Sequence, residues 1–141
     1  MKQVNRKGFT LIELLVVIAI IGVLSTLAVV ALGSARIKAR DAKRVADVRQ
    51  IMSALELYYN DANRYPSSIT EGAAIATNSV TYMNSVPGNP TPADDGTCAS
   101  NTEYVYTSAT GSSYTLQYCL GGKVGDIDPG IQTASQNGLT Q

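Results

Sequence analysis

The chain has 141 residues with 11 basic and 11 acidic side chains, so its formal net charge at pH 7 is zero. It contains no histidine, which excludes histidine-based acid–base chemistry, serine–histidine dyads and histidine metal sites. No CxxC pair, GxSxG sequence or P-loop occurs, so we expect no enzymatic activity, cofactor or small-molecule substrate. This length suits one domain, or an anchor with one small domain.

The first predicted element is a helix that is apolar on every side. Leu14 to Gly33 is a run of 20 residues without a charge. At about 1.5 Å per residue the run would span about 30 Å, the thickness of the hydrocarbon core of a bilayer. Glu13 lies just before it, and a carboxylate there costs about 2 to 3 kcal/mol to insert, so we expect it to have a partner.

A specific motif stands between the basic leader, residues 1–8, and the apolar run: Gly8 to Glu13 reads GFTLIE. It resembles the class III signal of type IV prepilins and type II secretion pseudopilins. The resemblance implies that a membrane enzyme, the prepilin peptidase, cleaves between Gly8 and Phe9 and methylates the new amino group of Phe9. It also implies that Glu13 neutralises such an amine, and that the subunits polymerise into filaments through their N-terminal helices at an inner-membrane assembly platform.

Two other interpretations of this segment are weaker. A secretory signal peptide could be cleaved near Gly33-Ser34-Ala35, but the apolar run is too long for one and an acid inside it is out of place. A plain membrane anchor leaves Glu13 unexplained.

From Ala35 to about Asn60 the helical pattern becomes amphipathic, so we predict one continuous helix from about Phe9 to about Asn60. Its apolar positions recur at steps of three and four residues: Ile37, Val45, Val48, Ile51, Met52, Leu55, Tyr58 and Tyr59. Much of the remaining surface of this stem is occupied by cations: Arg36, Lys38, Arg40, Lys43, Arg44 and Arg49.

The charges are unevenly distributed. Residues 34–49 hold six basic and two acidic residues, a balance of +4, whereas residues 50–141 hold two basic and eight acidic residues, a balance of −6. The basic stretch is either a solvated helix face that touches lipid phosphates or a surface that docks on the acidic heads of neighbouring subunits. Basic residues alone do not identify a nucleic-acid site, and we expect no nucleic-acid partner.

After a helix stop at Asn60 to Ser67, several short elements follow. The sequence from Ser68 to Glu71 fits a capping box and predicts a short helix from Ile69 to about Thr77. We predict a short strand from Val80 to Met83 and a loop from Asn84 to Thr102.

The clearest hairpin joins Tyr104–Thr110 to Ser113–Leu120 through a turn at Gly111-Ser112. A period of two places four apolar side chains on one face, which should cover the apolar stripe of the stem: Tyr114, Leu116, Tyr118 and Leu120. These tyrosines are better explained as core and rim than as a binding site. Gly121 to Gln141 should end in a short strand or fray.

Two cysteines, Cys98 and Cys119, lie in the C-terminal part of the chain. In an exported small domain such a pair predicts a disulfide, and the alternative is two buried free thiols in the cytosol. The bridge would close a loop of about 20 residues and contribute about 3 kcal/mol. Asp126 and Asp128 resemble the opening of a calcium loop, but the rest of the EF-hand spacing is missing, so no metal site is assigned. Because some secretion pseudopilins bind calcium in a C-terminal loop, the resemblance keeps calcium binding by these two aspartates as a hypothesis.

These observations predict an α+β fold in which a long N-terminal helix, apolar in its first half and amphipathic in its second, packs on a small antiparallel sheet. The expected parts are a leader (1–8), a transmembrane and assembly helix (9–34), an amphipathic stem (35–60) and a globular head (61–141). The resemblance implies a structural subunit of a type IV pilus-like filament, or alternatively a pseudopilin of a type II secretion system. It places the subunit in the inner membrane as a single pass with the head outside the cytoplasm, before assembly. A membrane-anchored binding domain that never polymerises is a third alternative.

Overall fold

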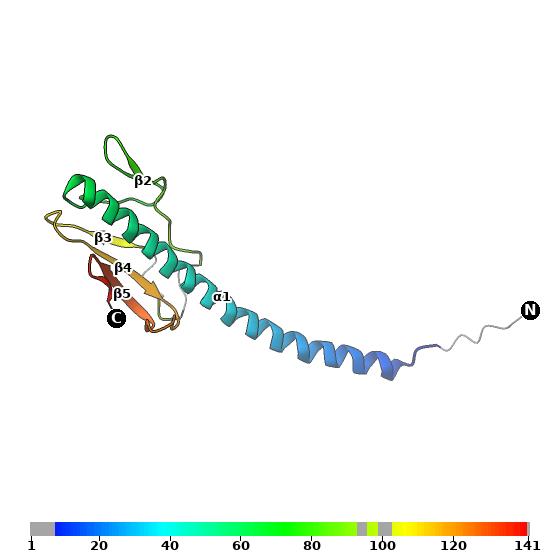
Figure 1. The fold of residues 1–141 in the computed structure, drawn as a ribbon. Helices are drawn as coiled ribbons and strands as arrows, with labels where there is room; N and C mark the ends of the chain where they lie inside the picture. The colour runs from blue at the N-terminus through cyan, green and yellow to red at the C-terminus, as the bar shows by residue number, and fades with distance from the viewer. Residues whose placement is uncertain (1–7, 93–95, 99–102, 141) are drawn as a thin grey trace, which may run out of the picture. The chain divides into compact units, whose positions relative to one another are not determined.

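The computed structural model of the chain describes residues 8–92, 96–98 and 103–140. Within them the elements are, in chain order, α1 (Leu11–Ala62), β1 (Ile75–Ala76), β2 (Thr81–Met83), the 3-10 turn η1 (Gly96–Cys98), β3 (Val105–Thr107), β4 (Thr115–Leu120), β5 (Gly130–Ser135) and β6 (Gly138–Thr140) (Figure 1). The predicted α+β class, with one long N-terminal helix and small antiparallel sheets, is confirmed.

The chain divides into two compact units, Met1–Ala35 and Arg36–Gln141, and α1 contributes to both. In the first unit the large apolar side chains from Leu11 to Leu32 are 48 to 81% exposed. This stretch is long and apolar enough to cross a membrane, by length and composition. A helix that is apolar on all sides needs lipid or other protein around it.

The observed bounds of α1 agree with the predicted ones to within two residues. At its C-terminal end Asn63 has a positive φ of 52°, and its N–H donates to the carbonyl of Tyr59 at 2.8 Å. A left-handed residue just past the last turn is a common helix end, and a nearby proline prevents the helix from continuing. The helix stop predicted at residues 60–67 is therefore confirmed.

The core of the second unit forms where α1 lies across β3, β4 and β5 (Figure 1). The predicted stripe of α1 supplies side chains that are at most 4% exposed: Val45, Val48, Ile51 and Leu55. The predicted face of β4 and the residue before it supplies side chains that are at most 2% exposed: Tyr114, Leu116, Tyr118 and Leu120. The expectation that this face covers the stem is confirmed.

Four antiparallel strands make the main sheet in the order β3-β4-β5-β6. The predicted hairpin is present with shorter strands, which end at the pair Thr107 and Thr115. Gly111 has a φ of +74° in the connection, and its carbonyl accepts a hydrogen bond of 2.7 Å from the N–H of Tyr65. The hairpin loop is thereby tied to the segment that follows α1.

The C-terminal segment is more ordered than predicted. It forms two strands, and β5 pairs along the whole of β4, from Thr115 opposite Ser135 to Leu120 opposite Gly130. Because alternate residues of β5 face the core, Ala134 is fully buried while Ile131 is 61% exposed. Glycine and glutamine conceal this alternation in the sequence.

The predicted helix from Ile69 to Thr77 is wrong. Gly72 has a φ of +76°, and its N–H donates to the carbonyl of Val86 at 2.9 Å. The N–H of Val86 donates in turn to the carbonyl of Ala73 at 2.8 Å. The backbone groups of Gly72 and Ala73 are therefore hydrogen-bonded to Val86 and not within a helix. The segment continues as β1, which pairs with β2 inside the predicted strand Val80–Met83. The loop predicted at 84–102 contains η1, and its residues 93–95 and 99–102 lie outside the described residues.

Candidate functional site

The residues of the N-terminal motif lie at the start of α1. Phe9 is 89% exposed, and nothing lies within 4 Å of the position where a Cβ on Gly8 would be. The Thr10 N–H and the Thr10 hydroxyl both donate to Glu13 Oε2 at 2.8 Å. The Glu13 N–H donates back to Thr10 Oγ1 at 3.3 Å. Thr10 and Glu13 thus form a capping box, which satisfies amide groups that the first turn of a helix leaves free.

This capping box gives Glu13 a partner within its own chain, which the sequence analysis did not identify. The signal was available, because a threonine followed three residues later by a glutamate before an apolar run is the typical pattern. Both bonds from Thr10 end on Oε2. Within the described residues, Oε1 is therefore still able to accept a hydrogen bond from an amine.

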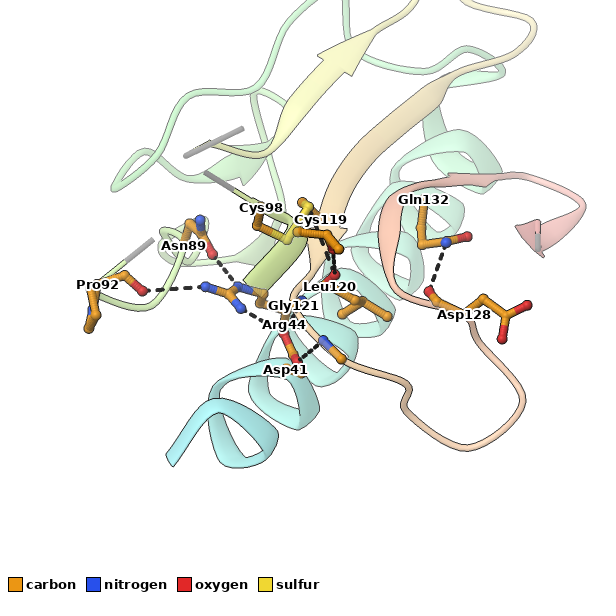
Figure 2. Close-up of a disulfide and its surroundings, with 12 residues drawn as sticks. Asp41, Arg44, Asn89, Pro92, Cys98, Cys119, Leu120, Gly121, Asp128 and Gln132 are labelled. Atoms are coloured by element: carbon orange, nitrogen blue, oxygen red, sulfur yellow. Dashed lines mark hydrogen bonds and ion pairs between the residues drawn. A yellow bond between two sulfur atoms is a disulfide. The ribbon is translucent and has the colours of Figure 1, made fainter. Parts of the chain in front are cut away.

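A second cluster of polar side chains is buried where α1 enters the head (Figure 2). Arg44 Nη1 donates to Asp41 Oδ1 at 2.7 Å, and both side chains are 1% exposed. The amides of Gly121 and Gly122 donate to the two oxygens of Asp41 at 3.0 and 2.8 Å. Arg44 also donates through Nε to Asn89 Oδ1 at 2.7 Å. We call Asp41, Arg44 and these partners the neck cluster.

The neck cluster corrects the prediction that the cations of the stem lie on its outer surface. Arg44 is buried and ion-paired, because it is close to Asp41 on the helix and is covered by the loop that contains Asn89. Arg40 is half-buried, and the other four cations of the stem are exposed: Arg36, Lys38, Lys43 and Arg49.

The predicted disulfide between Cys98 and Cys119 is present, with 5.7 Å between the Cα atoms. Both residues are buried, and Thr97 Oγ1 donates to the carbonyl of Leu120 beside them at 3.0 Å. A Cβ on Gly96 would lie 2.5 Å from the carbonyl oxygen of Gly121. The disulfide loop is therefore packed against Gly121, which also donates to Asp41 (Figure 2).

Tyrosines of the head donate to carboxylates of α1 at three heights along the helix. The bonds run from Tyr104 to Asp47 Oδ2 at 3.3 Å, from Tyr65 to Glu56 Oε1 at 2.9 Å, and from Tyr82 to Asp61 Oδ2. Burial and the neighbouring carboxylate raise the pKa of Tyr104 and of Tyr65 above the usual range. Burial also raises the pKa of Asp47, against the opposing effects of Lys43 and the Tyr104 hydrogen bond.

The loop that contains Asp126 and Asp128 is closed by bonds of the chain itself. Val124 and Ile127 exchange two backbone hydrogen bonds of 3.0 Å, with Gly125 at a φ of +60° between them. Lys123 Nζ lies 2.9 Å from Asp128 Oδ1. Among the described residues there is no group of three or more histidine, cysteine, aspartate or glutamate side chains that could hold a metal ion. The calcium hypothesis therefore gains no support from this loop.

Comparison with known proteins gives one family model and several relatives that match part of the chain. Residues 4–33 match the family model described as the prokaryotic N-terminal methylation motif. The chain is 48% identical over 64 residues to the type II secretion system core protein G of Pectobacterium carotovorum, which covers 45% of this chain and 41% of that protein.

Two other relatives are named as a pilus component and as a fimbrial protein. The type IV wide pilus major component PilA4 of Thermus thermophilus is 44% identical over 64 residues, covering 45% of this chain and 49% of that protein. The fimbrial protein EcpC of Eikenella corrodens is 40% identical over 88 residues, covering 61% and 56%. The chain spans about half the length of the curated relatives it matches. No solved structure matches it.

Proposed function

We propose, on the premise that the N-terminal half of the chain belongs to the type IV pilin and type II secretion pseudopilin family, that this protein is a filament subunit. It is a structural protein rather than an enzyme. The observation that carries the proposal is the methylation motif of residues 4–33, which includes the part of α1 whose apolar side chains are exposed on all sides. Such a helix is stable when lipid surrounds it, and in a filament other copies of the helix would replace the lipid.

In this proposal the chain works as four parts. The leader, residues 1–8, is removed by prepilin peptidase between Gly8 and Phe9, and Phe9 becomes the methylated amino terminus. Residues 9–34 hold the subunit in the inner membrane and later form the filament core, whereas residues 35–60 are the stem of the head, residues 61–141. The disulfide fits a head outside the cytoplasm, because such bonds persist in oxidising compartments.

Glu13 is the residue that would set the axial register between subunits. The methylated amine of Phe9 on one copy pairs with the Glu13 carboxylate of the next, so that neither charge stays unpaired in an apolar environment. The capping box is compatible with this role, since Oε2 holds Thr10 and Oε1 remains able to accept the amine. Glu13 would then both start its own helix and bind its neighbour.

Among filaments of this family, we favour the pseudopilus of a type II secretion system. Six relatives have the name type II secretion system core protein G. A type IV pilus is the second candidate, and the similarity to PilA4 and EcpC favours it. Deletion of the gene separates the two, because it would abolish protein secretion in the first case and long surface fibres in the second.

The test compares two substitutions at Glu13 in cells that contain the processing and assembly machinery. Glutamine can still cap the helix but has no charge, so Glu13→Gln should leave α1 intact and impair fibre formation. Glu13→Ala also removes the Glu13 half of the capping box, while Thr10 still accepts from the N–H of residue 13, so it should add a loss of helix stability below about 1 kcal/mol. Assembly is measured by chemical crosslinking between copies in the membrane and by protein secretion, or by sheared fibre if surface fibres form, and the mature amino terminus by mass spectrometry.

Normal fibre from Glu13→Gln would contradict the charge-pairing account while leaving the filament proposal intact. A mature protein that begins at Met1, or beyond the apolar segment, would contradict the filament proposal itself. A processed protein that stays monomeric and binds a ligand saturably would support the third alternative, an anchored binding domain.

A further inference from the structure

Two cations follow the apolar part of α1 before the head begins to cover the helix. Arg36 and Lys38 are exposed, Arg40 is half-buried, and Asp41 is the first buried residue of α1. Residues 34–40 include no acidic residue. Within the part of the chain that the structure describes, no ion pair joins Arg36 or Lys38 to a carboxylate. The positive charge of these two side chains is therefore not compensated by the described residues.

The cations further along the stem have acids beside them. Arg44 belongs to the buried ion pair of the neck cluster. Lys43 acts electrostatically on the carboxylate of Asp47, one helical turn further along. Arg49 lines an open groove together with Asp126. The structure thus narrows the basic stretch of the sequence to two cations at its start that act on something outside the head.

The places of these two cations along α1 match the headgroup layer of a bilayer. When the uncharged run that ends at Gly33 fills the hydrocarbon core, Arg36 lies about 4.5 Å beyond the core and Lys38 about 7.5 Å beyond it. The headgroup layer is about 5 to 7 Å thick on each side of the core. Positions two apart on a helix differ by about 200° around its axis, so the two residues lie on nearly opposite sides. Their long side chains can therefore reach lipid phosphates all around the helix.

We propose that Arg36 and Lys38 bind the phosphate groups of anionic phospholipids in the leaflet that faces the head, before the subunit assembles. Arginine and lysine both bind phosphate, arginine through two parallel hydrogen bonds and lysine as a point charge. A lipid with a net negative charge is preferred, because a zwitterionic headgroup brings a cation of its own. The inference rests on the part of the proposed function that places residues 9–34 in a membrane, and it adds the class of lipid that holds the start of the stem. Entry into a filament would have to break these contacts.

The experiment measures which lipids associate with the full chain in vesicles that contain no assembly machinery. Spin-labelled phosphatidylglycerol and phosphatidylcholine report the association of an anionic and a zwitterionic lipid. The preference for phosphatidylglycerol should fall by up to about fivefold for each of Arg36→Gln and Lys38→Gln, and in the parent chain it should weaken at high salt. Arg64→Gln, the matched control, removes one exposed cation beyond the C-terminal end of α1 and should leave the preference unchanged. The leader is the same in every variant, so the differences report the substituted positions alone.

A second measurement identifies the partner directly. A photo-crosslinking amino acid in place of Ala39, an exposed residue next to Lys38, should give an adduct with the mass of the chain plus one phospholipid. Crosslinks to the acidic head of a second copy instead would overturn the inference in favour of docking between subunits. An unchanged lipid preference in the double variant of Arg36 and Lys38 would overturn it as well. A chain that does not float with the vesicles at all would contradict the membrane part of the proposed function itself.

Discussion

Arg44 Nη1 lies 2.7 Å from Asp41 Oδ1 in an ion pair that is almost completely buried. The pair joins three segments that are far apart in the chain, because Asp41 binds Gly121 and Gly122 while Arg44 binds Asn89. Buried ion pairs do not always stabilise a fold, but removal of one partner leaves the other charge uncompensated.

Replacement of Arg44 by methionine should therefore destabilise the head by about 3 to 5 kcal/mol. Asp41→Asn should cost a similar amount, because it leaves the buried guanidinium without a counter-charge and turns its amide nitrogen toward a glycine N–H. Chemical denaturation of the full chain in detergent, followed by tyrosine fluorescence, measures both. Lys38→Met is the matched control, since Lys38 is exposed on the same helix and should change stability by less than about 0.5 kcal/mol. An equal effect of Arg44→Met and Lys38→Met would contradict this role of the pair.

The disulfide should contribute about 3 kcal/mol to the stability of the head, because it closes a loop with a sequence separation of 21 residues. The double variant Cys98→Ser and Cys119→Ser should show this loss in the same denaturation assay. Each single variant should be no more stable than the double one, since it also leaves a free thiol. A double variant as stable as the parent would show that the packing of Thr97 and Gly96 suffices to hold this loop.

Stability should fall steeply in alkali. The folded chain raises the pKa of Tyr65, Tyr104 and Tyr114 above the ordinary value of 10.0, mainly through burial. The unfolded chain therefore loses these protons first, and the stability present below about pH 10 is lost as the pH rises towards the folded pKa values. Each phenol can remove up to about 1.4 kcal/mol per pH unit.

Free energies of unfolding measured from pH 8 to pH 11 check this slope. Tyr104→Phe should reduce the slope of the unfolding free energy against pH, because one buried phenol no longer titrates. Tyr58→Phe, at a half-exposed position, is the comparison and should change the slope less. A flat profile over this range would contradict the contribution of the buried phenols.

Calcium should have no effect on the head. Lys123 pairs with Asp128, and the Val124–Ile127 turn is closed by its own backbone bonds. Melting temperatures with millimolar calcium and with a chelator should agree. A higher melting temperature in calcium that Asp126→Asn abolishes would show that this loop opens to bind the ion.

Capping boxes illustrate what could be predicted from the sequence and what could not. The pattern at Ser68 to Glu71 predicted a helix that does not form, because Gly72 takes a left-handed conformation and Val86 pairs with this segment. The same pattern at Thr10 to Glu13 does cap a helix, because a long apolar run without proline follows it. The pattern itself does not distinguish the two cases, and the residues after it do.

The hairpin, the buried face of β4 and the disulfide pair were all predictable, because they depend on local alternation and on a single possible pairing of cysteines. The burial of Arg44 was not, since its partners Asn89 and Gly121 come from distant loops. Likewise, the sequence of β5 does not by itself indicate a strand, because what makes it one is its pairing with the edge of β4.

The three tyrosine–carboxylate bonds have a mechanical consequence. The outermost two carboxylates, Asp47 and Asp61, lie 14 positions apart on α1, or about 21 Å along its axis, with Glu56 between them. A force along the axis of α1 loads the three hydrogen bonds at the same time, so the forces needed to break them add. A force that lifts the head away from the helix breaks them one after another. The head should accordingly withstand axial traction better than lateral peeling, and optical-tweezer pulling from two attachment points can compare the two directions.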